Sequence, residues 1–135
     1  MVDSAVVIDA SVAAAWCFHD EATEASRTLL RSLPDRQVVV PLLWHAKCAS
    51  LLLTGERRKR VCAELLELLG GLPIETDNET ARIPGPVLRL APTRGLTVYD
   101  AIYADLASRR GMALATRDKH VRQAASAMRV AVIEM

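Results

Sequence analysis

Five short apolar runs, separated by longer helical patterns, constrain the fold more than any other feature of this sequence. The runs are rich in Val, Ile, Leu and Ala and do not alternate between apolar and polar residues, which is typical of strands buried on both faces. We therefore expect an α/β fold, with a parallel sheet of about five strands and helices on both of its faces. The predicted strands are residues 5–8, 38–40, 72–75, 112–115 and 130–134.

The segments between these runs carry the spacing of amphipathic helices. Gly55 and Gly111 lie where helices are expected to end. Pro84 and Pro86 fall inside one helical pattern and are expected to break it into two pieces. The predicted helices are residues 21–33, 42–55, 59–71, 79–91, 99–111 and 118–127.

Length and composition indicate one domain that spans residues 1–135. Hydrophobic residues make up 51% of the chain and aromatic residues only 4%, so the core is expected to be aliphatic. No window has the ~18 uninterrupted apolar residues of a membrane span, and Asp3 and Asp9 make the N-terminus unlike a signal peptide. The three cysteines are odd in number, form no C-x-x-C pair and have apolar neighbours, which favours buried, reduced thiols in a cytoplasmic protein.

The net charge of +1 excludes a polycation, so nucleic-acid binding would need a local basic patch or a bound metal. One cluster, Arg57, Arg58, Lys59 and Arg60, is either a solvated helix end or a contact for RNA or an acidic partner. The helices over residues 42–70 also hold more leucines than one inner face needs. A homodimer surface or a groove for a partner peptide would use the excess.

Three aspartates are expected at the carboxyl edge of the sheet, where open parallel sheets form their sites. Asp9 directly follows the first strand, Asp118 follows the fourth, and Asp100 lies in the first turn of the helix at 99–111. Asp118 fits a helix N-cap as well as it fits a site. Asp9 and Asp100 are better explained as a site, because carboxylates that converge in a cleft are costly unless they hold a cation. Mg²⁺ or Mn²⁺ would suit such oxygen ligands.

Other classes of site lack their motifs. The chain has no G-x-G-x-x-G and no G-x-x-x-x-G-K-[ST], so neither a dinucleotide nor a P-loop site is indicated. Asp9 is followed by Ala10 rather than a second acid, which argues against a receiver domain. Ser11 replaces the second aspartate that a haloacid-dehalogenase-type phosphatase would need.

Three stretches together resemble the PIN-domain ribonucleases, and most closely the VapC-type toxins of toxin–antitoxin pairs. They are "VVIDASVAAAW", "VVVPLLWHAKCASLLL" and "GLTVYDAIYADLASRRGMALATRD", in the family's order and over nearly the whole chain. The resemblance implies a parallel sheet flanked by helices and an acidic cluster that uses Mg²⁺ or Mn²⁺ to cleave RNA. It also implies a cognate antitoxin as partner.

The family's site residues map onto this chain with one departure. Asp9, Asp100 and Asp118 match its first, third and fourth acids, and Ser11 and Thr116 match hydroxyl residues beside them. The family's second acid is a glutamate in a pattern like P-x-L-W-x-x-E. Pro41, Leu43 and Trp44 match this pattern, and Lys47 stands where the glutamate would be.

Several roles for Lys47 follow. Its ammonium could form salt bridges with the acids and partly replace the metal, or contact the scissile phosphate while the aspartates hold one ion. The lysine could be a deliberate exchange that lowers toxicity, or it could extend to solvent along Trp44. We therefore predict a metal-dependent endoribonuclease toxin, cytoplasmic and dimeric, that Lys47 impairs. The alternative is an inactive PIN fold that binds its antitoxin and RNA without cutting.

Overall fold

The computed structural model describes residues 5–18, 20–57 and 70–135. A parallel five-stranded sheet with the order β3-β2-β1-β4-β5 forms its centre, as the apolar runs predict. β3 begins two residues later than expected. Pro73 has no N–H to donate to a ladder, so pairing begins only after it. The strands are β1 (Ala5–Ile8), β2 (Gln37–Pro41), β3 (Ile74–Asp77), β4 (Ala113–Thr116) and β5 (Val132–Glu134).

The helices connect these strands in the expected places, with one addition. The sequence analysis missed α1 (Ala10–Cys17), a helix of small apolar residues that begins directly after β1. The pattern at 59–71 lies outside the described residues except for Gly70 and Gly71, which are helical. The other α-helices are α2 (Glu24–Ser32), α3 (Leu42–Arg57), α5 (Leu88–Arg94), α6 (Val98–Arg110) and α7 (Lys119–Ala127), and the short helical turns are η2 (Leu33–Asp35), η3 (Thr80–Arg82) and η4 (Ile83–Val87).

Glycine and proline positions explain most of the helix ends. Gly111 closes α6 in the left-handed conformation, with φ of 63°, as expected for a C-cap. The same expectation for Gly55 is wrong, because α3 continues through it to Arg57. The break at Pro84 and Pro86 is confirmed, since Gly85 between them has non-helical backbone angles of φ −125° and ψ −108°.

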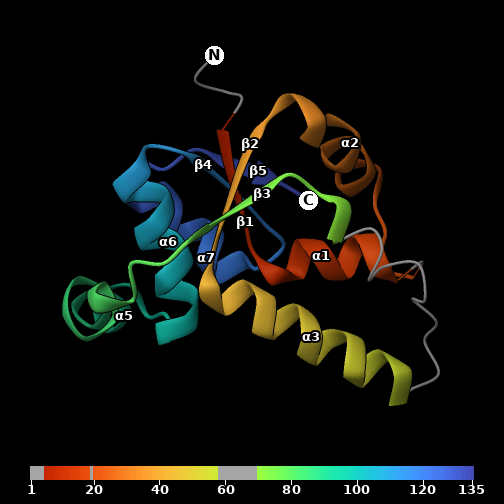
Figure 1. The fold of residues 1–135 in the computed structure, drawn as a ribbon. Coiled ribbons are helices and arrows are strands. Elements are labelled where there is room, and N and C mark those ends of the chain that lie inside the picture. The colour runs from red at the N-terminus through yellow and green to blue at the C-terminus, as the bar shows by residue number, and fades with distance from the viewer. Residues whose placement is uncertain (1–4, 19, 58–69) are drawn as a thin grey trace.

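Helices cover both faces of the sheet (Figure 1). α1, α2 and α3 lie on one side, where α1 contacts the other two. α5 and α6 lie on the other side, and α7 packs on α6 and β4. This division follows from topology, because the chain moves outward from β1 to β3 and then crosses back to β4, which reverses the face that right-handed crossovers use. No helix in the described ranges is long and apolar enough to cross a membrane.

The core is aliphatic, as the low aromatic content predicts. The side chains of β1, β2 and β4 pack with Leu106 of α6 and with the helices of the opposite face. Ile8, Leu106 and Leu114 are among the largest side chains that are fully buried. The central strands therefore hold both helical layers in register, and the residues that follow β1 and β4 extend from a rigid edge.

We expect Leu114→Ala to lower the free energy of unfolding by about 2–5 kcal/mol, because it removes a fully buried side chain and leaves a cavity. Urea unfolding of the whole chain measures this. Leu53→Ala is the matched control, since Leu53 is 51% exposed, and it should change stability by no more than about 0.5 kcal/mol. Equal losses in the two variants would contradict the described core.

Candidate active site

The candidate site lies where the strand order reverses. β1 and β4 are neighbours in the sheet, yet β2, β3 and their helices separate them in the chain. The backbone N–H of Asp9 donates to the carbonyl of Ala115 at 3.2 Å, which extends the pairing to the carboxyl end of both strands. Residues that follow β1 and β4 thus lie together, and this is the position at which open α/β sheets form sites.

Asp9 is held at this point by two hydroxyl groups. Its side chain is only 6% exposed. One carboxylate oxygen accepts hydrogen bonds from the backbone N–H of Ser11, at 2.9 Å, and from the Ser11 hydroxyl. The other accepts from the hydroxyl of Thr116, at the end of β4. The structure therefore brings together Asp9, Ser11 and Thr116, as the sequence analysis expected.

Burial dominates the electrostatics of Asp9. It raises the pKa of the carboxyl above its ordinary value, while the hydrogen bonds from Ser11 and Thr116 lower that pKa to a smaller extent. No cationic side chain is among the causes of the shift. In the part of the chain that the structure describes, Asp9 forms no ion pair. The site thus contains a buried negative charge that the surrounding side chains leave uncompensated.

Asp118 lies on the loop after β4 and caps α7. One of its carboxylate oxygens accepts from the backbone N–H of His120 at 2.8 Å and of Val121 at 3.3 Å, so the N-cap interpretation is confirmed. Its own N–H donates to the Thr116 hydroxyl at 3.0 Å, and the N–H of Arg117 donates to the Ser11 hydroxyl at 3.1 Å. Ser11 and Thr116 therefore link Asp9 to the loop that carries Asp118.

Asp100 lies in the first turn of α6, after the N-cap Thr97, whose hydroxyl accepts from the Asp100 N–H at 3.1 Å. Tyr103 stands three residues later, on the same face of the helix. Burial first, and then the charges of Asp9, Cys48 and Asp100, raise the pKa of the Tyr103 phenol. Asp9 and Asp100 therefore act on one buried group from two different elements.

Sequence reasoning missed Tyr103 and Cys48. Tyr103 is buried, and its hydroxyl has no hydrogen-bond partner among the described residues. Burial and the charge of Asp9 raise the pKa of the Cys48 thiol to about 12, so it stays protonated at neutral pH. Tyr103 is three residues after Asp100, and Cys48 directly follows Lys47. These positions in the sequence would have placed both residues beside the site. Of the other thiols, Cys17 is only half-buried and donates to the Ala13 carbonyl, and Cys62 lies outside the described residues.

Lys47 does not form the salt bridges with the acids that the sequence analysis raised first. Within the described residues it makes no ion pair, and its ammonium lies over the ring of Tyr99, 5.0 Å from the ring centroid. Such a cation–π contact contributes about 0.5–1 kcal/mol at an exposed site. It places the ammonium beside the first turn of α6, where Tyr99 is 54% exposed.

The side chains around Asp9 fit only one kind of metal site, an open site for a divalent ion. Among the residues that the structure describes, no three carboxylate, imidazole or thiol groups lie close enough to share an ion. The groups around the buried charge of Asp9 are nevertheless oxygen donors, namely the hydroxyls of Ser11 and Thr116. Mg²⁺ and Mn²⁺ prefer oxygen and often take only one or two carboxylates from the protein, with water and phosphate completing the shell. The residues fit such an open site and not a closed protein cage.

Two further predicted surfaces fall largely outside the description. Arg58, Lys59 and Arg60 lie outside the described residues, and so does the side chain of Arg57, the last residue of α3. The leucine-rich surface is described only in part. Leu53 is exposed and Leu51 is half-buried.

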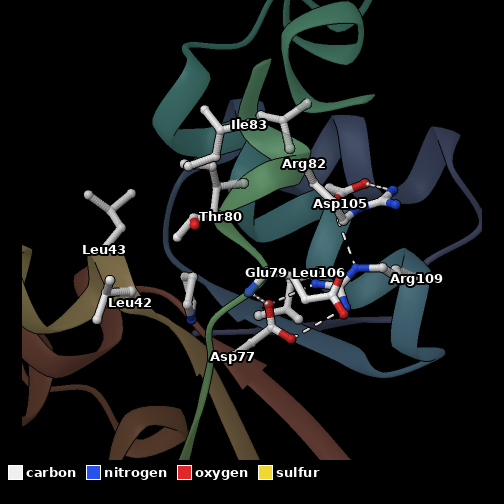
Figure 2. A pocket seen from close by; sticks show the side chains of 13 residues that line it. Leu42, Leu43, Asp77, Glu79, Thr80, Arg82, Ile83, Asp105, Leu106 and Arg109 are labelled. Carbon is white, nitrogen blue, oxygen red and sulfur yellow. Dashed lines mark hydrogen bonds and ion pairs between the residues drawn. The ribbon is translucent and has the colours of Figure 1, made fainter. Parts of the chain in front are cut away.

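A separate pocket lies on the opposite face of α6 (Figure 2). Its apolar lining includes Leu42 and Leu43 from the start of α3, together with Ile83 and Leu106. Ile102, Asp105, Leu106 and Arg109 of α6 line it, whereas Asp100 and Tyr103 point to the other side of the same helix. The pocket is therefore distinct from the acidic site.

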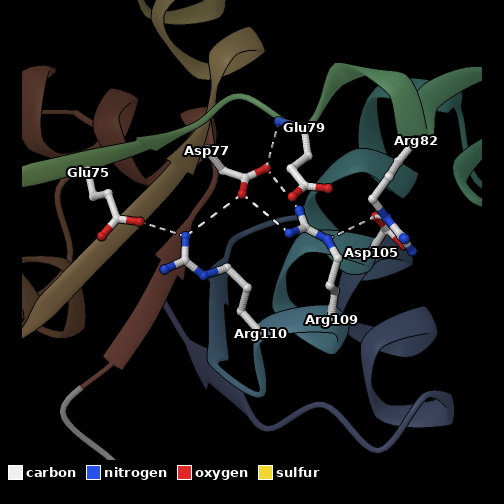
Figure 3. A network of polar contacts seen from close by, with 7 residues as sticks. All are labelled: Glu75, Asp77, Glu79, Arg82, Asp105, Arg109 and Arg110. Carbon is white, nitrogen blue, oxygen red and sulfur yellow. Dashed lines mark hydrogen bonds and ion pairs between the residues drawn. The ribbon is translucent and has the colours of Figure 1, made fainter.

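Ion pairs border this pocket and join α6 to β3 (Figure 3). Asp77, at the end of β3, accepts from Arg109 at 2.8 Å, and Glu75 accepts from Arg110 at 2.6 Å. On the other side of Arg109, Asp105 pairs with Arg82 at 2.7 Å. Partial burial raises the pKa of Asp77, but the hydrogen bonds and charges of the arginines outweigh it and keep that pKa below its ordinary value.

We expect Asp9→Asn to make the protein more stable at pH 7. The raised pKa means that folding disfavours the charged carboxylate, and this penalty is fully present above the raised pKa. Asn removes the charge. Its amide oxygen can still accept from Ser11, and its amide NH2 can donate to the Thr116 hydroxyl in place of the bond that Asp9 accepts from it. A gain in the free energy of unfolding is therefore expected in metal-free buffer.

Urea unfolding across a pH series tests this sign. The gain should shrink as the pH falls through the raised pKa and should vanish below the ordinary value of 3.8. Asp35→Asn, at an exposed carboxylate, should change stability by less than about 0.5 kcal/mol. A loss of stability in Asp9→Asn at pH 7 would mean that the hydrogen bonds outweigh burial.

Comparison with known proteins identifies the family. The family model of the PIN domain matches residues 6–127. Among solved structures, PAE2754 from Pyrobaculum aerophilum aligns over 98% of this chain and 84% of its own, with TM-score 0.70 and 23% identity. The structure of VapBC2 from Rickettsia felis bound to a promoter DNA fragment aligns over 96% of this chain and 98% of its own, with TM-score 0.63 and 12% identity. A toxin–antitoxin complex from Klebsiella pneumoniae aligns over 84% of this chain and 86% of its own matched chain, with TM-score 0.58 and 15% identity. None of the curated proteins matches the sequence. The chain belongs to the PIN-domain family.

Proposed function

We propose that this protein is a toxin of a toxin–antitoxin pair that cleaves RNA phosphodiesters with Mg²⁺ or Mn²⁺. The observation that carries the proposal is the buried, uncompensated charge of Asp9 at the strand-order reversal, with Asp100 acting on the same buried tyrosine. A buried carboxylate without a cationic partner is costly even when it is hydrogen-bonded, and a bound cation would offset that cost. Membership of the PIN family supports a nuclease rather than another metal-binding protein.

Asp9, Asp100 and Asp118 are the candidate ligands. Because no three described acids lie close enough to share an ion, one or two of them would bind it, with water and phosphate completing the shell. When bound, the ion would supply a Lewis acid for the phosphodiester and lower the pKa of an attacking water. Ser11 and Thr116 fix the orientation of the Asp9 carboxylate by donating to its two oxygens. Because the same hydroxyls accept from Arg117 and Asp118, they also hold the loop after β4 in place.

Partners follow from the proteins that share the fold. One similar structure is a toxin–antitoxin complex, and FitAB and VapBC2 are described as bound to DNA fragments. On this basis we propose a cognate antitoxin as partner of this chain. RNA as substrate and a homodimer as its assembly are proposed from the resemblance to the VapC-type toxins. The buried thiol of Cys48, whose pKa is raised to about 12, supports the proposal of a reducing, cytoplasmic location.

Lys47 is expected to reduce the activity without abolishing it. It adds a positive charge near the aspartates, which weakens cation binding. Its contact with Tyr99 holds that charge beside the first turn of α6 and leaves Asp9 without an ion pair in the described structure. This arrangement favours the hypothesis in which the aspartates keep an ion and Lys47 faces the substrate.

Cleavage of a mixed RNA substrate by the native chain, with Mg²⁺ or Mn²⁺, tests the proposal. We expect slow cleavage by the native chain and faster turnover by Lys47→Glu, which adds a carboxylate ligand. Removal of groups that only support metal ligands costs about 10–100-fold, so Asp100→Ala, which removes a ligand, should cost at least about 100-fold. A cleavage rate in Asp100→Ala equal to the native rate would contradict the assignment of the site. If neither the native chain nor Lys47→Glu cuts any RNA, the non-cutting binding module becomes the better explanation.

Metal binding can be tested without activity. We expect 10 mM Mg²⁺ to raise the melting temperature of the native chain by a few degrees, since an ion that binds only the folded state stabilises it by about 2.7 kcal/mol at 100 times its Kd. Asp9→Asn should be more stable than the native chain in EDTA and should gain much less from Mg²⁺. Differential scanning calorimetry measures both values. The same Mg²⁺ shift in the two proteins would show that Asp9 does not bind the ion.

A further inference from the structure

Tyr99 lies outside the two buried core clusters of the described structure. It precedes Asp100 in the first turn of α6, and at 54% exposure it is one of four large apolar side chains that the described structure leaves in solvent. Tyr103, four residues later on the same face of α6, is buried, whereas Tyr99 lies one turn closer to the start of the helix, where the chain leaves it more than half exposed. An aromatic ring in solvent beside an acidic site therefore needs an explanation other than the core.

The ammonium of Lys47 is the second part of this surface. It lies 5.0 Å from the centroid of the Tyr99 ring and makes no ion pair within the described residues. Arg117, a cation on the loop after β4, is instead paired with Glu21 at 2.9 Å. Lys47 thus offers a positive charge that no carboxylate in the described structure neutralises, next to an accessible ring.

A ring and a cation at this spacing suit one nucleotide of an unpaired strand. Bases of single-stranded nucleic acid stack on exposed aromatic side chains, while cations neutralise the adjoining phosphate. A duplex does not offer an unstacked base to such a ring. The three aspartates repel phosphate, so a cation at the outer end of the site would favour the approach of a strand toward them.

We infer that Lys47 and Tyr99 form a subsite for one nucleotide of single-stranded RNA, in which a base stacks on Tyr99 and its phosphate contacts Lys47. The inference rests on the proposed function, because it assigns a substrate contact to the same site. It gives the lysine a role in binding that is separate from its effect on the ion.

Binding of a non-cleavable strand tests the subsite separately from cleavage. The probe is a fluorescein-labelled 12-nucleotide 2′-O-methyl oligouridine, measured by fluorescence anisotropy with the full chain in Mg²⁺. Tyr99→Leu should weaken binding at least about fivefold, since loss of one stacked base has an effect of this size, whereas Tyr99→Phe should bind like the native chain. Lys47→Gln should weaken binding and reduce the slope of log Kd against log salt by about one.

Leu88→Ala is the matched control, because Leu88 is equally exposed at 54% and lies on α5, outside the subsite. It should bind like the native chain. The inference is overturned if Tyr99→Leu binds as tightly as the native chain, or if the native chain does not bind the strand. It is also overturned if Tyr99→Leu weakens binding of a 12-base-pair duplex as much as that of the single strand. If Tyr99→Leu instead dissociates a dimer in sedimentation velocity and leaves RNA binding unchanged, the ring belongs to a contact between copies.

The outcomes separate this inference from the proposed function. Cleavage that depends on Asp100, together with unchanged binding in Tyr99→Leu, would leave the nuclease intact and remove the subsite. Binding that depends on Tyr99 in a chain that cuts no RNA would keep the subsite and remove the nuclease.

Discussion

The pairing of β1 with β4 is the constraint on which the site depends. It joins two segments that are more than one hundred residues apart. The hydrogen bond from the Asp9 N–H to the Ala115 carbonyl extends the pairing to the residue that follows β1. Because the last three residues of each strand are buried, a shift of register would expose apolar side chains, and the ladder is therefore fixed by the core. The rigid edge then determines where Asp9, Thr116 and Asp118 can lie.

A charge is buried at this edge at a cost to stability. Ser11 and Thr116 reduce the cost with hydrogen bonds, but burial still dominates the pKa of Asp9. Proteins often retain such unfavourable groups at functional sites, where a ligand compensates for them. The local structure is otherwise well satisfied. Asp118 caps α7 and Thr97 caps α6, so the chain around Asp9 has few other sources of strain.

Much of the fold could be predicted from the sequence, because it depends on patterns that are local. Short apolar runs without alternation predicted all five strands, and the Pro84–Pro86 pair predicted the break before α5. The helix α1 was missed because its small residues, Ala13, Ala14 and Ala15 among them, show no amphipathic spacing. The prediction that α3 ends at Gly55 was wrong because a glycine inside a helix lowers helix stability by only about 1 kcal/mol, which packing can outweigh.

The site was harder to predict, because its details depend on which side chains meet. Periodicity placed Asp9 and Asp100 on the right elements, and the hydroxyls of Ser11 and Thr116 contact Asp9. It could not show that Lys47 would contact Tyr99 rather than an acid, since a flexible four-carbon side chain reaches several partners from one position. It also gave no sign of the unpartnered hydroxyl of Tyr103, which arises only when α6 packs against β1.

α6 links the acidic site to the edge of the sheet, because its two opposite faces carry different groups of side chains. One face carries Asp100 and Tyr103 toward Asp9, and the other carries Asp105 and Arg109 toward β3 and η3. The paired carboxylate of Asp77 lies at the same edge of the sheet as Asp9 but has two arginines as partners, so its pKa falls whereas that of Asp9 rises. The ion pairs of Arg109 and Arg110 tie the helix to the edge strand, and the core ties it to β1. The position of Asp100 relative to Asp9 is thus fixed from both sides, although the two residues belong to elements far apart in the chain.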